Sequence, residues 1–144
     1  MDKKVEIKRM IIISNEFYRI TKLSEKSALQ INRLELIPIV VNCAFSIELS
    51  LKSLYYAINN KKTSGHNLKL LYNSVKMCGL EKYLLSAFTS NEIDKIIDEL
   101  ENAFVEFRYL YEQKKIIIIS SSLLKDFILF VNSFCNRYIN YNVK

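Results

Sequence analysis

The sequence predicts an all-α protein folded as an up-and-down bundle of four to five helices. Half of the 144 residues are hydrophobic, and only two glycines and one proline are present, so tight hairpins are disfavoured. Apolar residues also recur every three or four positions over long stretches, as they do on one face of a helix. No composition break divides the chain, which is long enough for one core. Residues 1–144 are therefore expected to form a single domain.

The first two helices are expected over about residues 3–26 and 37–57. In the second, Pro38 suits the first turn, because its fixed φ is helical and its missing N–H would have no intrahelical partner. In the first, the apolar positions expected to face the core are Val5, Ile7, Met10, Ile13, Phe17, Ile20 and Leu23.

The polar run from Asn59 to Gly65 predicts a loop, after which Asn67 is placed to cap a third helix. Gly79 is expected to end that helix. The pair Thr89 and Glu92, three residues apart ahead of an apolar run, has the form of a capping box.

A fourth helix should follow this capping box and continue to about Tyr111. Residues 113–119 include four consecutive isoleucines and are expected to form an extended connector, because β-branched side chains disfavour a short helix. A last helix should run from the serines at 120–122 to about Tyr141. Its inward positions are expected to be Leu123, Leu124, Phe127, Phe130, Val131 and Phe134.

Several classes of protein are disfavoured by the sequence. The longest apolar stretch, residues 36–58, contains Glu48 and Lys52, and charges at the centre of a bilayer helix are costly. The apolar run near the N-terminus is too short for the core of a signal peptide. The three cysteines are odd in number and form no Cys-x-x-Cys pair, which indicates reduced thiols. We expect a cytoplasmic protein with no membrane partner, no metal and no cofactor.

Charge composition leaves two interpretations open. Twenty-one lysines and arginines against fifteen acidic residues give a formal net charge of +6. This excess is compatible with an anionic partner such as nucleic acid, and equally with ordinary solubility.

Glu48 is the first candidate for a functional side chain, because it lies within an apolar stripe of the second helix. Buried charges persist only when they are paired and hydrogen-bonded. Lys52, four residues on, is one available partner, and Arg108 of the fourth helix is another. Glu48 is either one member of an ion pair that fixes the register between helices or a carboxylate with a direct function.

Arg108 also has two interpretations. Next to Tyr109, it is suited to hold a phosphate while the aromatic ring stacks on a base, as basic and aromatic side chains do in RNA recognition. Lys114 and Lys115 follow closely and suit phosphate binding too. Alternatively, Arg108 pairs with Glu112 or Glu101 on its own helix.

His66 is the only histidine, and histidine is the residue type best suited to proton transfer near neutral pH. It directly follows Gly65 and precedes the expected cap. It therefore serves either catalysis or the local geometry at the start of the third helix.

Three segments together resemble one known family. They are Asn42–Lys52, Gly65–Leu68 and Phe107–Glu112, and their order and spacing are similar to those of the HEPN superfamily of small prokaryotic helical-bundle proteins. The resemblance implies a helical bundle that is often dimeric. Many members of that family are metal-independent ribonucleases of toxin–antitoxin, phage-defence and related systems.

The ribonucleases of that family carry an arginine followed, after four to six intervening residues, by a histidine. Counting from Arg108, the candidate positions hold Gln113, Lys114 and Lys115. We therefore expect a noncatalytic or weakly active homodimer that binds RNA or a protein partner, such as a cognate antitoxin or a nucleotidyltransferase. The alternative is a divergent metal-independent ribonuclease that uses Arg108 with Glu48 and His66.

Overall fold

The computed structural model describes residues 2–27, 36–101 and 121–143, and all regular structure in these ranges is helical. This confirms the all-α class. The elements are α1 (Lys3–Ser27), α2 (Leu36–Asn59), α3 (Leu68–Val75), the 3₁₀ turn η2 (Lys76–Cys78), α4 (Leu80–Leu84), α5 (Ser90–Glu101) and α7 (Ser121–Asn142).

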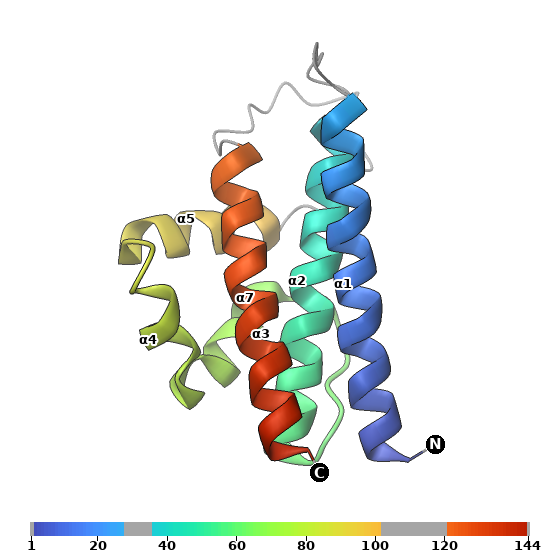
Figure 1. Ribbon diagram of the computed structural model, residues 1–144. Coiled ribbons are helices and arrows are strands. Elements are labelled where there is room, and N and C mark those ends of the chain that lie inside the picture. Colours follow the sequence, from blue (N-terminus) through green and yellow to red (C-terminus); the bar gives the residue numbers. More distant parts are fainter. Residues whose placement is uncertain (1, 28–35, 102–120, 144) are drawn as a thin grey trace.

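The three long helices α1, α2 and α7 lie side by side, with α2 and α7 running opposite to α1 (Figure 1). Helix α2 packs against both of the others. The shorter helices cover one side of this group, where α3 contacts α2 and α5, and α4 contacts α7. The expected up-and-down bundle is therefore confirmed, with a layer of short helices added to it.

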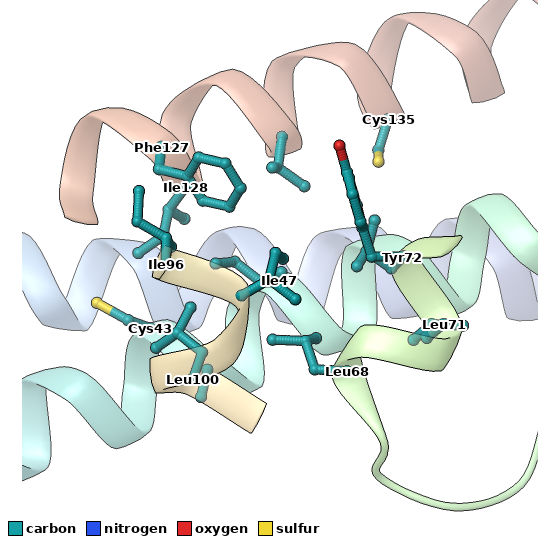
Figure 2. Close-up of a cluster of buried hydrophobic side chains, with 14 of the residues drawn as sticks. Cys43, Ile47, Leu68, Leu71, Tyr72, Ile96, Leu100, Phe127, Ile128 and Cys135 are labelled. Carbon is teal, nitrogen blue, oxygen red and sulfur yellow. The ribbon is translucent and has the colours of Figure 1, made fainter. Parts of the chain in front are cut away.

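The core lies between α1, α2, α7 and the short helices, and Figure 2 shows the part of it that α2, α7 and the short helices enclose. Its largest fully buried side chains include Ile47 of α2, Leu68 of α3, Ile96 and Leu100 of α5, and Phe127 of α7. Along each helix, apolar residues recur every three or four positions and so form a stripe on one face. The stripes of the separate helices meet in one cluster. On α7, Leu124, Phe127 and Val131 are buried as expected, whereas Leu123, Phe130 and Phe134 are partly buried.

Two groups that can lose a proton lie in this core. Burial raises the pKa of Tyr72 to about 12, and the carboxylates of Glu81 and Asp94 add to the effect. Burial also raises the pKa of the Cys135 thiol. Both side chains therefore remain neutral at physiological pH and act as packing groups.

Part of the face that α1 turns towards the bundle differs from the face that apolar spacing predicted. Ile7 and Ile11 are buried, and so are the polar Ser14 and Thr21. Four of the expected core positions are exposed instead, namely Val5, Ile13, Ile20 and Leu23. The prediction was wrong for these four because small hydroxyl side chains can be buried when they are hydrogen-bonded, which a count of apolar residues ignores.

A buried polar network joins the three long helices. The hydroxyl of Ser14 on α1 donates to the backbone oxygen of Ser46 on α2 (2.6 Å), and the Ser46 hydroxyl donates to the backbone oxygen of Ser14 (2.9 Å). The hydroxyl of Ser50 donates to Asn132 Oδ1 on α7 (2.6 Å), and Asn132 Nδ2 donates to Ser46 Oγ (3.0 Å). Sliding any one helix would leave buried polar groups unpaired, so the network fixes helix register.

The predicted helix starts in the middle of the chain are confirmed. Asn67 Oδ1 accepts a hydrogen bond from the Leu70 backbone N–H (2.9 Å), which caps α3. The Thr89 N–H donates to Glu92 Oε2 (2.8 Å), and the Glu92 N–H donates to Thr89 Oγ1 (3.2 Å), so the capping box is formed. These motifs are local in sequence, which is why they could be predicted.

The region around Gly79 differs in detail from the prediction. Helix α3 ends at Val75, and Gly79 adopts a left-handed φ of 106° after the 3₁₀ turn that follows. The short helix α4 begins directly after Gly79 and was not expected. The extended connector at 113–119, and the continuation of the fourth helix to Tyr111, lie outside the described residues.

Replacing Asn132 with alanine is expected to lower the free energy of unfolding by about 1–3 kcal/mol, because the buried hydroxyls of Ser46 and Ser50 lose a partner. Urea unfolding measures this loss. Asn142→Ala is the matched control, since this exposed amide donates a hydrogen bond to the backbone oxygen of Tyr138 on its own helix. Equal losses in the two variants would contradict the role of the network.

The capping box should make stability depend on pH. The backbone N–H of Thr89, followed by its hydroxyl, lowers the pKa of Glu92 below its ordinary value of 4.5. Because the folded-state pKa is the lower one, the stabilisation is fully present above pH 4.5 and is lost as the pH falls through the folded-state pKa. Glu92→Gln should therefore flatten the acid limb of a plot of unfolding free energy against pH. The control is Glu99→Gln, which neutralises an acidic side chain of the same helix outside the capping box, and identical curves for the two variants would count against this assignment.

Candidate functional site

Glu48 is a buried carboxylate on α2, with only 4% of its surface exposed. Lys52 lies one helical turn further along, and its Nζ is 2.6 Å from Glu48 Oε1. The lysine side chain is itself only 18% exposed. The structure thus shows the intrahelical partner that spacing on the helix had suggested, and the pair is shielded from water.

The loop between α2 and α3 carries His66 to the same carboxylate. Asn60 has a φ of 55° and Gly65 a φ of 89°, so two left-handed residues turn the chain back towards α2. Asn67 then caps the start of α3, which fixes the position of the backbone at the preceding residue, His66. As a result, His66 Nδ1 lies 2.9 Å from Glu48 Oε1, although the two residues are 18 positions apart.

One carboxylate oxygen therefore contacts two nitrogen groups. With Nδ1 donating to Glu48, a neutral His66 carries its lone pair on Nε2, and its ring is held in a fixed orientation. The His66 side chain is 70% exposed, so this oriented ring faces solvent while its carboxylate partner does not. Among the described residues, the second oxygen, Glu48 Oε2, is buried without a hydrogen-bond partner. The arrangement is suited to orienting a base or a cation.

A pocket of about 280 Å³ opens beside this group. Its wall combines a cation, an imidazole, a phenol and several hydroxyls, together with apolar side chains of α3. The lining residues are Lys52, Tyr55, Thr63, Ser64, Gly65, His66, Asn67, Leu70, Leu71 and Ser74. A pocket with these groups offers hydrogen-bond donors for an anion and apolar surface for an attached ring.

Of the residues singled out from the sequence, Glu48 and His66 meet in the structure. Arg108 and Tyr109 lie outside the described residues, and so do Lys114 and Lys115. The contact expected between Glu48 and Arg108 therefore stays a prediction.

The structure adds two side chains of α2 to the candidate site, Lys52 and Tyr55. Their positions four and seven residues after Glu48 place all three on one helical face, which is a signal that the sequence contains. The loop hydroxyls of Thr63 and Ser64 had no such signal, because their placement depends on the path of the loop.

Within the described ranges, no group of three or more histidine, cysteine or acidic side chains is arranged to hold a metal ion. None of the helices in those ranges combines the length and the apolar character needed to cross a bilayer.

Comparison with known proteins gives one finding. The family described as HEPN domain matches residues 24–140, which is most of the chain and includes Glu48, Lys52 and His66. No curated protein and no solved structure matches the chain.

Replacing Lys52 with methionine should cost about 3 kcal/mol of unfolding free energy, because Glu48 is left buried with less compensation. The double variant Lys52→Met, Glu48→Gln should cost less than this single change, since it removes the buried charge as well. Thermal and urea unfolding measure both effects. The control is Lys69→Met, which breaks an ion pair with Asp98 whose side chains are about half exposed, and which should change little. A double variant less stable than Lys52→Met would contradict the buried-charge argument.

Proposed function

The chain belongs to the HEPN domain family, and we propose that it binds RNA through the pocket beside Glu48, Lys52 and His66. One observation carries this proposal. The buried carboxylate of Glu48 holds a lysine and a histidine at the same edge of the pocket, within 2.9 Å of a single oxygen atom. The Lys52 ammonium has N–H groups left over for a phosphate oxygen, and the His66 ring beside it, held in place by Glu48, presents Nε2 as an acceptor for a ribose hydroxyl.

The chemistry of the pocket supports a nucleic-acid ligand in two further ways. Tyr55 supplies an aromatic surface for a base, and the hydroxyls of Ser64 and Ser74 supply hydrogen bonds for a sugar. The formal net charge of +6 favours approach of a polyanion. We further propose Arg108, Tyr109, Lys114 and Lys115 as phosphate and base contacts, from their sequence pattern.

A second candidate function is metal-independent cleavage of RNA, favoured by the hydrogen-bond distance between His66 Nδ1 and Glu48 Oε1. In this reaction His66 Nε2 takes the proton of a ribose 2′-hydroxyl while the 2′-oxygen attacks the adjacent phosphorus. The bond from phosphorus to the 5′-oxygen breaks, that oxygen takes a proton from water, and a 2′,3′-cyclic phosphate remains. Arg108 would neutralise the charge on the phosphate. Glu48 would hold the imidazole in its productive tautomer.

We place this activity in a toxin–antitoxin or phage-defence setting, on the ground of family membership. The proposed protein partner there is a cognate antitoxin or a nucleotidyltransferase, and the proposed assembly is a homodimer.

His66→Ala is expected to weaken binding of a fluorescent single-stranded RNA by about tenfold, the loss of roughly one hydrogen bond from a ribose hydroxyl to Nε2. Binding should also weaken steeply with added salt, because phosphate contacts release counterions. Fluorescence anisotropy over a salt series measures both. Lys95→Ala is the control, since it removes a positive charge from the exposed side of α5, outside the residues that line the pocket.

The same RNA, examined by gel for a 2′,3′-cyclic phosphate end, separates the two candidate functions. Binding without cleavage supports the RNA-binding function, whereas cleavage lost in Glu48→Gln and His66→Ala supports the nuclease. Absence of RNA binding at low salt, or equal weakening by Lys95→Ala, would contradict the proposal and leave a protein partner as the function of this face.

A further inference from the structure

The loop between α2 and α3 is tied to helix α1 by an ion pair. Lys62 Nζ, in the loop, lies 2.6 Å from Glu6 Oε1, in the first turn of α1. The two helices run in opposite directions, so α1 begins beside the end of α2 where this loop starts (Figure 1). The Glu6 side chain is only 24% exposed, and the lysine reaches it from the solvent side. The pair therefore connects a surface loop to the bundle.

The ring of Tyr56 contributes to the same connection. Lys62 Nζ lies 6.0 Å from the centroid of this ring, and Lys3 Nζ of α1 lies 5.6 Å from it. Both distances are in the range of a cation–π interaction. Lys62 thus contacts α1 through Glu6 and the last turn of α2 through Tyr56.

The position of this loop depends on side-chain contacts. Among the described residues, 61–65 form no hydrogen bond between backbone groups. Holding each of these residues in one conformation costs conformational entropy, which other contacts must offset. The contact between Lys62 and Glu6 holds the first part of the loop, and the contact between His66 Nδ1 and Glu48 Oε1 (2.9 Å) holds its end. Four positions separate these two anchors, so the first restricts where the second can lie.

We propose that Glu6 and Lys62 are positioning residues for the pocket, because their ion pair keeps the loop where Glu48 orients the ring of His66. This inference rests on the proposed function, since it gives two residues outside the pocket lining a part in RNA binding. When the ion pair is broken, the loop leaves His66 away from Glu48 for part of the time. Affinity falls in proportion to the fraction of molecules that are competent to bind. An exposed ion pair is of modest strength, so its loss should change affinity by a few fold.

The first test needs no RNA. His66 is the only histidine, so its ring is the single source of histidine signals in NMR. In mildly alkaline buffer, long-range proton–nitrogen correlation spectra of the wild type should show the Nδ1–H tautomer, because Glu48 Oε1 accepts that proton. Glu6→Gln and Lys62→Met should each give a mixture with the Nε2–H tautomer. The double variant should contain no more of the Nε2–H form than either single variant, because both changes break the same contact.

RNA affinity then separates positioning from net charge. Glu6→Gln removes a negative charge, so charge alone predicts tighter binding of the fluorescent RNA. Positioning predicts the opposite, a loss of affinity of about threefold. Lys62→Met should lose at least as much, because it also removes a positive charge.

Lys61→Met is the matched control. It removes the same charge from the same loop, and Lys61 forms no ion pair within the part of the chain that the structure describes. It should keep the Nδ1–H tautomer and lose less affinity than Lys62→Met. Circular dichroism should show melting close to that of the wild type for all four variants, since an exposed ion pair contributes little to global stability.

An unchanged tautomer in both Glu6→Gln and Lys62→Met would overturn the inference at any RNA affinity. Tighter RNA binding by Glu6→Gln would overturn it as well, and so would an equal tautomer shift in Lys61→Met. A tautomer shift in both ion-pair variants of a chain whose wild type binds no RNA would support the positioning of His66 and contradict the proposed function. The two proposals can therefore fail separately.

Discussion

The hydrogen-bond network of Ser14, Ser46, Ser50 and Asn132 is the constraint on which the arrangement of this molecule depends. It joins particular turns of α1, α2 and α7, and it fixes the rotation of α2 about its own axis. Ser46 and Ser50 are four residues apart and share the face of α2 that meets α1 and α7. Glu48 lies two residues from each of them, so its carboxylate projects from a different face of α2. The register of the bundle and the direction of the site carboxylate are thus set by the same contacts.

The sequence was informative where structure is determined locally. Asn67 and the pair of Thr89 and Glu92 act on backbone groups within three residues, so their caps could be predicted. The orientation of α1 could not be predicted in full, because Ser14 is buried by partners 32 and 118 positions away. Without knowledge of those partners, apolar spacing assigned Val5 and Leu23 to the core.

The candidate site also combines a contact that is local in sequence with one that depends on distant parts of the chain. The contact between Glu48 and Lys52 follows from helical spacing and was one of the alternatives that the sequence offered. The contact between Glu48 and His66 depends on how a polar loop returns to α2. The sequence supported it only as part of the alternative in which both residues serve one ribonuclease site. The pocket depends on that return as well, because its wall is shared between α2, the loop and the start of α3.

The left-handed backbone of the loop has an evolutionary consequence. A Cβ atom added at Gly65 would meet no atom within 4 Å, so the preference for glycine there is torsional and not steric. Asparagine and aspartate, which adopt this backbone most readily among other residues, are the natural replacements during sequence drift. An insertion or deletion between Asn60 and Gly65 would instead change where His66 lies relative to Glu48. Related chains can therefore vary the composition of this loop much more freely than its length.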